Sequence, residues 1–303
     1  MTQRVALIDP LAVIDGRKVF FLRDTFGGEV PLSCPYPPLE LAFAASLLRE
    51  GGHQPDLIAA NVRGWNHDRV VEHLSRSTPD VVLVPSAWGS LVDDRLLFQK
   101  LRRVAPNATL MISGPNVTAT PEKVLETTDV DAVILGEPEE AVRLVADGEA
   151  WSEIPNLAYR ENDGVVLTER RLPPDWIHQP APARDLLDLP KYTIPFARRG
   201  LATTVATTRG CLHACTFCPS QLWNHRTVRA RPVDAVIAEF EELAGRYGVR
   251  EIHFRDDTFT WNHERVHAIC DAMDKAGLDL TWRCFGSAST VNQELLQRMA
   301  ASG

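Results

Sequence analysis

The chain has 303 residues, of which 45% are hydrophobic, and this length is typical of about two domains with substantial cores. Its formal net charge of -8 argues against a nucleic-acid-binding surface, because phosphate contacts depend on a basic face. The sequence has no run of about eighteen apolar residues and no signal-peptide layout at its start, so we expect a cytoplasmic protein without a membrane partner.

Apolar runs alternate with segments of helical spacing in the first half of the chain. The expected strands cover residues 4–9, 56–62, 80–86, 108–114 and 131–136, and the clearest helices cover residues 39–52 and 94–105. This alternation is typical of a parallel sheet covered by helices on both faces. We therefore predict an α/β fold with a doubly wound, Rossmann-like domain over residues 1–150, whose ligands would lie at the carboxyl ends of the strands.

Residues 151–199 are expected to connect two domains. A hairpin is predicted within residues 156–170, because strand-like halves flank the turn residues Asn162, Asp163 and Gly164. The proline-rich segment 172–190 favours an extended path and interrupts regular structure, so it is interpreted as the domain linker.

From about residue 200, strand and helix patterns alternate again. Strands are expected at residues 201–207, 251–259 and 280–288, and helices at residues 233–248, 263–277 and 292–303. The pattern predicts a second α/β domain over residues 200–303.

Three cysteines follow the first of these strands with the spacing C-x3-C-x2-C. Cys211, Cys215 and Cys218 lie on one loop, short enough for their sulfurs to converge on a single metal. A structural zinc would need a fourth ligand, which His213 or His225 could supply. A [4Fe-4S] cluster held by three thiolates would instead keep one iron open for a ligand. Three unrelated packing cysteines are the remaining alternative.

The segment "TTRGCLHACTFC", residues 207–218, closely resembles the cluster loop of the radical S-adenosylmethionine (SAM) enzymes. The resemblance implies that the three cysteines bind a [4Fe-4S] cluster, whose open iron chelates SAM. An electron from the cluster then cleaves SAM to a 5'-deoxyadenosyl radical, so an electron donor such as flavodoxin or ferredoxin is an implied partner. The resemblance also places Phe217 beside the adenine of SAM, although packing within the loop is an equal alternative.

The first half resembles the cobalamin-binding domain that precedes many radical SAM barrels. The resemblance rests on residues 36–58, 112–126 and 130–140, and it implies that residues 1–150 bind cobalamin. Asn116 stands where relatives commonly have histidine, and the Asp-x-His-x-x-Gly motif of other cobalamin proteins is absent from the sequence. Small or polar residues at predicted strand ends are the candidate cobalamin contacts, with turn or capping roles as alternatives: Ser86, Gly114, Thr118, Gly136 and Glu137.

Polar residues at the ends of the later strands are candidates for the SAM site. Asp256 and Asp257 follow the second strand of this domain, where the family presents polar groups to the SAM amino group. Because adjacent strand residues point to opposite faces, we expect at most one of the two to face the interior. Ser287, at the end of the third strand, is a similar candidate. Other polar residues are expected on the solvated surface: Arg229, Arg231, His53, His67 and His73.

The two resemblances together predict a cobalamin-dependent radical SAM enzyme. The expected activity is methylation of an unreactive carbon or phosphorus centre of a small molecule. A radical cyclase or rearrangement enzyme with the same domains is one alternative, and a non-catalytic metal- or cobalamin-binding module is another. Relatives complete a barrel of about six strand and helix units, so the chain is expected to be a fragment that carries the first half of a partial (βα)6 barrel.

Overall fold

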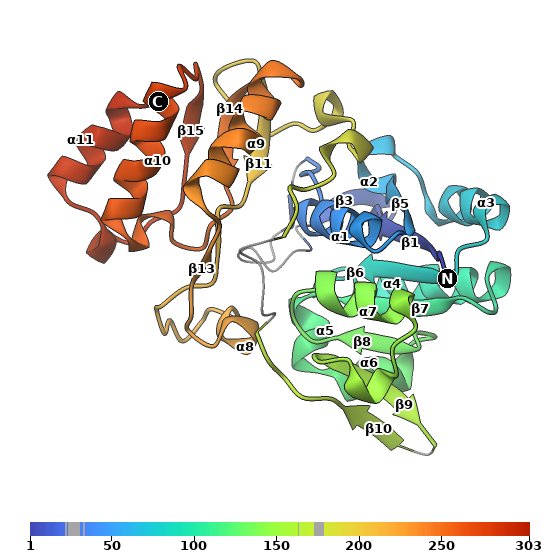
Figure 1. Ribbon diagram of the computed structural model, residues 1–303. Helices are drawn as coiled ribbons and strands as arrows, with labels where there is room; N and C mark the ends of the chain where they lie inside the picture. The colour runs from blue at the N-terminus through green and yellow to red at the C-terminus, as the bar shows by residue number, and fades with distance from the viewer. Residues whose placement is uncertain (22, 24–30, 33, 163, 173–178) are drawn as a thin grey trace.

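The computed structural model describes residues 1–21, 23, 31–32, 34–162, 164–172 and 179–303. Figure 1 shows two α/β units beside each other, one built around β1 to β10 and the other around β11 to β15. The centre of the predicted hairpin turn, Asp163, and residues 173–178 of the predicted linker lie outside the described residues.

A seven-stranded sheet forms the centre of the first unit, in the order β10-β9-β8-β7-β6-β1-β5. Its strands are β1 (Arg4–Asp9), β5 (Gln54–Ala59), β6 (Val81–Pro85), β7 (Thr109–Ser113), β8 (Ala132–Ile134), β9 (Leu157–Glu161) and β10 (Gly164–Leu167). The first five pair in parallel, which confirms the predicted doubly wound sheet. Their order reverses between β1 and β6, and such a switch point is where ligands of these folds bind.

Helices cover both faces of this sheet, as the alternation of buried residues requires. The elements are α1 (Leu39–Glu50), α2 (Ala60–Arg63), α3 (His67–Ser77), α4 (Leu91–Val104), α5 (Pro115–Ala119), α6 (Pro121–Thr127) and α7 (Glu139–Asp147). Val5, Leu7 and Leu83 pack against α1 and α7. Residues one position away, such as Ala6 and Val82, pack with α3, α4 and α6. The strand expected over residues 56–62 ends earlier, because α2 begins at Ala60.

The predicted hairpin extends this sheet instead of standing apart in the connector. β9 pairs antiparallel with β8, and β10 pairs antiparallel with β9. A smaller three-stranded ribbon lies between β1 and α1 in the chain, made of β2 (Ala12–Ile14), β3 (Arg17–Phe21) and β4 (Pro31–Leu32).

The second unit contains the three expected strand and helix units. Its parallel sheet has the order β11-β14-β15, and a short antiparallel ribbon joins β12 to β13. The strands are β11 (Leu201–Val205), β12 (Thr208–Arg209), β13 (Arg229–Ala230), β14 (Val249–Phe254) and β15 (Thr281–Arg283). The helices are α8 (Gln221–Asn224), α9 (Val233–Gly245), α10 (His263–Lys275) and α11 (Gln293–Ala301).

The described part of the connector after residue 178 packs against both units. Short 3-10 turns occupy Trp151–Glu153, Arg184–Leu186 and Leu189–Lys191. The Ser46 hydroxyl donates to the carbonyl of Ala181 at 2.6 Å, which ties the connector to α1. Leu187, Leu189 and Tyr192 belong to one hydrophobic cluster that contains residues of both sheets. The two units therefore share a continuous core.

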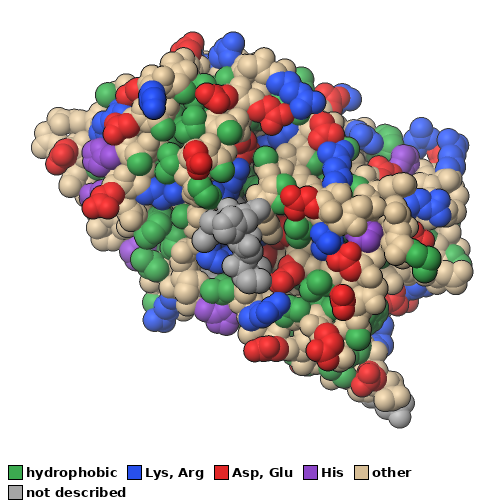
Figure 2. Space-filling view, in the orientation of Figure 1, with side chains coloured by type: hydrophobic (Ala, Val, Ile, Leu, Met, Phe, Trp, Pro, Cys, Tyr) green, Lys and Arg blue, Asp and Glu red, His purple; other side chains and the backbone are tan. Residues whose placement is uncertain are grey.

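Charged residues of both signs are interspersed over the face shown in Figure 2. Among the described residues, no helix combines the length and apolar character needed to span a bilayer.

Gly114 follows β7 at a point where two loops of the first unit lie very close together. Its φ is +122°, and a Cβ there would lie 2.2 Å from the carbonyl oxygen of Ser86. We expect Gly114→Ala to lower the free energy of unfolding by about 3 kcal/mol or more, measured by urea denaturation with circular dichroism. Gly52→Ala is the control, because Gly52 has φ +75° with no atom within 4 Å of its Cβ position, and should lose only about 1 kcal/mol. Equal losses would contradict this account of Gly114.

Candidate functional site

The cysteine loop leaves the carboxyl end of the second sheet, directly after β11 and β12. Gly210, with φ +97°, provides the left-handed turn that begins the loop. Cys215 is exposed, whereas Cys211 and Cys218 are partly buried, and none of the three forms a disulfide. The backbone N–H of Cys218 donates to the carbonyl of Cys215 at 3.1 Å, which closes a turn between the last two cysteines.

Hydroxyl groups accompany two of the three thiols. The Thr258 Oγ1 lies 3.3 Å from the Sγ of Cys211, and the Ser220 Oγ lies 3.2 Å from the Sγ of Cys218. Within the described part of the chain, no three His, Cys, Asp or Glu side chains gather closely enough to hold a metal ion. The three thiols thus share one loop without converging. As a donor set, three accessible thiols fit an iron–sulfur cluster.

Phe217 projects from this loop into solvent. Its side chain is 88% exposed, so it does not pack within the loop, which was the alternative reading of this residue. The role beside adenine stays a prediction.

Asp256 anchors the segment that leads into the cysteine loop. It is fully buried at the end of β14 and accepts hydrogen bonds from the Thr207 backbone N–H at 2.7 Å, the Thr207 hydroxyl at 2.6 Å and the Thr208 hydroxyl at 2.7 Å. Burial raises the pKa of its carboxyl, although these hydrogen bonds oppose the shift. Asp257 is only partly buried, and Ser287 caps the 3-10 turn Ala288–Thr290. Contacts of these three residues with SAM stay predictions.

A polar group on β14 escaped the sequence reasoning. Ile252 and Phe254 belong to the apolar core, so Glu251 and His253 occupy the opposite face of the strand. Glu251 accepts from the backbone of Arg198 at 2.6 Å, from the side chain of Arg283 at 3.1 Å and from His253 at 3.1 Å. The alternation of polar and apolar residues in "EIHF" was the available signal for this inner face.

The cobalamin candidates meet at the carboxyl edge of β6, β7 and β8. The Ser86 hydroxyl donates to Asp94 at 2.7 Å and accepts from the Asn116 amide at 3.1 Å. The Thr118 hydroxyl donates to the carbonyl of Gly114 at 2.8 Å and accepts from the Gly136 N–H at 2.9 Å. These groups bind the loops of the edge to one another.

Four surface assignments are wrong. The side chain of His67 is mostly covered, and its Nε2 lies 3.1 Å from the Asp93 carboxylate. His53 is buried and its Nε2 lies 2.9 Å from the Asp147 carboxylate. Arg231 is also buried, and the side chain of Arg229 is mostly covered, because both arginines pair with buried glutamates. One of these glutamates is Glu137, whose carboxylate contacts Arg209 and Arg229 and so is already engaged within the chain. The contact of Glu137 with cobalamin stays a prediction.

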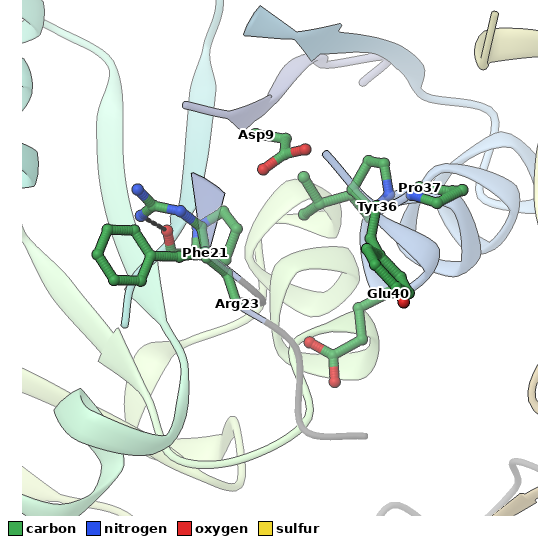
Figure 3. Close-up of a pocket in the computed structure, with 9 residues that line it drawn as sticks. Asp9, Phe21, Arg23, Tyr36, Pro37 and Glu40 are labelled. Atoms are coloured by element: carbon green, nitrogen blue, oxygen red, sulfur yellow. Dashed lines mark hydrogen bonds between the residues drawn. The ribbon is translucent and has the colours of Figure 1, made fainter. Parts of the chain in front are cut away.

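A small pocket lies at the switch point between β1 and β6 (Figure 3). It is lined by Asp9, Phe21, Arg23, Tyr36, Pro37, Pro38, Glu40, Leu41 and Pro85. The Arg23 guanidinium donates to the carbonyl of Pro85 and to Asp94, both at 2.9 Å. The Cζ of Arg255, which follows β14, lies 6.0 Å from the centroid of the Tyr36 ring. The pocket therefore lies where the carboxyl edges of the two sheets approach each other.

Comparisons with known proteins match the two units of the chain to two different families. Residues 32–146 match the family described as B12 binding domain, and residues 205–303 match the Radical SAM superfamily. An uncharacterised methyltransferase of Pyrococcus horikoshii is 32% identical over 280 residues, which cover 88% of this chain and 59% of that protein. Cytidylyl-2-hydroxyethylphosphonate methyltransferase of Streptomyces wedmorensis is 24% identical, over 99% of this chain and 63% of that protein. The chain thus spans less than two thirds of the length of either relative.

The fold also matches a solved structure. The cobalamin-dependent SAM radical enzyme OxsB, in its complex with aqua-cobalamin and SAM, superposes with a TM-score of 0.81 at 19% identity. The match covers all of this chain and 43% of OxsB.

Asp256→Ala should loosen the attachment of the cysteine loop. The substitution leaves a buried N–H and two hydroxyls without their acceptor, so we expect the free energy of unfolding to fall by about 3 kcal/mol. Urea denaturation gives the measurement. Asp271→Ala is the control, because Asp271 is exposed and pairs with Arg298 at the surface, a contact typically worth less than about 1 kcal/mol. A loss for Asp256→Ala no larger than the control would argue against the anchor.

His253 should make stability depend on pH. Burial lowers its pKa to about 4; the hydrogen bond with Glu251 opposes this shift, and Arg283 adds to it. Between about pH 6.5 and 4 the unfolded chain binds a proton at this histidine that the folded chain does not. Stability is therefore expected to fall as pH drops through this window, by about 3 kcal/mol, and His253→Gln should flatten that part of the profile. Parallel profiles of urea midpoint against pH for the two proteins would contradict the assignment.

Proposed function

We propose that this chain, which matches the B12 binding domain over residues 32–146 and the Radical SAM superfamily over residues 205–303, is a cobalamin-dependent radical SAM methyltransferase acting on an unreactive carbon or phosphorus centre of a small molecule. The main observation behind the proposal is that the carboxyl edges of the two parallel sheets lie close to each other. A loop with three accessible thiols leaves the carboxyl end of a parallel sheet, and this edge approaches the switch point of a B12-binding fold. The similarity to two methyltransferases favours methyl transfer over other radical chemistry.

The residues of the loop suit the binding of a cluster. Cys211, Cys215 and Cys218 would hold a [4Fe-4S] cluster, which leaves a position for SAM. Bound together, the cluster, SAM and cobalamin would supply the electron, the radical source and the methyl carrier. The hydroxyls of Thr258 and Ser220 lie near enough to hydrogen-bond to cluster thiolates, and such contacts adjust the reduction potential of a cluster.

The residues around the loop fix the strand end beneath it and line the inner face of the second sheet. Asp256 holds the strand end beneath the loop, and Glu251 and His253 form a polar inner face on β14. Because the thiols must stay reduced to bind iron, we propose a cytoplasmic location and a small electron-transfer protein, such as flavodoxin or ferredoxin, as partner.

Removal of the loop thiols tests the cluster. After anaerobic reconstitution we expect about four irons per chain, and single Cys211→Ala, Cys215→Ala or Cys218→Ala variants should lose most of this iron and the associated visible absorbance. Cys270→Ala is the control, because Cys270 is buried within α10 and should leave the iron content unchanged. Zinc without iron in the reconstituted protein would overturn the proposal.

Methyl-labelled SAM then separates methyl transfer from the alternatives. The reduced, reconstituted protein with hydroxocobalamin should release 5'-deoxyadenosine and transfer label to cobalamin. Release of 5'-deoxyadenosine without labelled cobalamin would favour a cyclase or rearrangement enzyme, whereas an intact cluster with neither product would favour a non-catalytic binding module.

A further inference from the structure

Two arginines bracket the cysteine loop. Arg209 is the last residue of β12, directly before the loop, and Arg229 is the first residue of β13, directly after it. The two residues are opposite each other in the antiparallel ribbon. Like charges in this position repel, so the ribbon requires a negative partner.

Glu137 and Glu139, which follow β8 in the first unit, supply that partner. A carboxylate oxygen of Glu137 lies 2.8 Å from the Nη1 of Arg209, and its other oxygen accepts from Arg229. Glu139 accepts from both terminal nitrogens of Arg209. The side chains are almost completely shielded from water, with exposed fractions of 2% for Arg209, 3% for Glu137 and 1% for Glu139.

Glu137 keeps its negative charge at neutral pH. Burial alone would raise the pKa of the Glu137 carboxyl, but the guanidinium groups of Arg209 and Arg229 outweigh burial and hold the pKa below its usual value. Glu137 contacts both arginines, so it joins the two ends of the loop.

The middle of the loop touches the same segment of the first unit. Trp223, on α8, is buried against Gly136, where a Cβ would lie 3.0 Å from the Cβ of Trp223. α8 also contacts α5 (Figure 1). Residues 136–139 thus contact the loop segment at its beginning, in its middle and at its end.

We propose that Glu137 is a positioning residue that sets the location of the cysteine loop relative to the cobalamin-binding unit. The shared hydrophobic cluster holds the two units together, but apolar contacts are not directional. Buried ion pairs often contribute little net stability, and the role that we assign to this one is to fix the geometry of the groups it joins. The inference rests on the proposed function for its consequence, which is a constant spacing between cluster and cobalamin.

Glu137→Gln removes the charge and keeps the shape of the side chain. Glu239→Gln is the matched control, since Glu239 is also buried between two arginines, Arg184 and Arg231, but contacts neither Arg209 nor residues 136–139 through those pairs. Amide hydrogen exchange, followed by mass spectrometry, is measured on the reconstituted protein and again before reconstitution. We expect amides of residues 210–228 to exchange at least tenfold faster in Glu137→Gln than in Glu239→Gln, a difference of about 1.4 kcal/mol.

A second readout reports the spacing itself. Pulsed electron paramagnetic resonance between the reduced cluster and cob(II)alamin should give a broader distance distribution in Glu137→Gln than in Glu239→Gln. Equal exchange and equal distributions in the two variants would overturn the proposal, as would equal acceleration in both, because that result indicates general destabilisation.

Two further arrangements keep the test decisive. If Glu137→Gln does not fold, the test uses Arg229→Gln, which removes the more exposed partner of Glu137. This variant should accelerate amide exchange of residues 210–228, and unchanged exchange would overturn the proposal. If the wild-type chain binds no iron, the proposed function fails, but exchange before reconstitution still decides the role of Glu137.

Discussion

Parallel strand pairing is the constraint on which the rest of this structure depends. It places the carboxyl ends of β1, β6, β7 and β8 at one edge of the first sheet, and those of β11, β14 and β15 at one edge of the second. Residues distant in sequence, such as Ser86, Gly114 and Gly136, therefore meet at one edge without any local signal that joins them. The thiol loop leaves the corresponding edge of the other sheet, and Tyr36 contacts Arg255 where the two edges approach.

The shared core determines that these edges face each other. Residues of α1 and α7, of the connector and of the second sheet belong to one hydrophobic cluster, so separation of the units would expose a large apolar surface. Within this core, buried glutamates are each matched to arginines: Glu137 and Glu139 to Arg209, and Glu239 to Arg184. Burial of a charge is costly unless a partner is placed at hydrogen-bonding distance, so these pairs restrict how the ribbon, the connector and α9 can pack.

Several polar residues make contacts that differ from those predicted for them. Glu137 occurs at a strand end, as predicted for a cobalamin contact, but its carboxylate contacts the arginines of the other unit. Asp256 lies beside the cysteine loop, as predicted for a SAM contact, but its oxygens are occupied by Thr207 and Thr208. Arg231, expected in solvent, is buried against Glu239, because the basic segment after the loop returns to the core instead of following the surface. For Glu137 and Asp256 the residue type indicated a polar site, and for all three residues the neighbours that define the role come from another part of the chain.

The sequence by itself determined the order and type of the elements, the doubly wound sheet and the three thiols of the loop. These features depend on short-range information: apolar runs predict strands, helical spacing predicts helices, and C-x3-C-x2-C confines three sulfurs to a few residues. Only the tertiary structure decided that the hairpin β9–β10 extends the first sheet, that the connector packs into the core, and that residues 136–139 contact the loop segment. Those features depend on contacts between residues more than ten positions apart, and a buried charge has the same appearance in sequence as an exposed one until its partner is placed beside it.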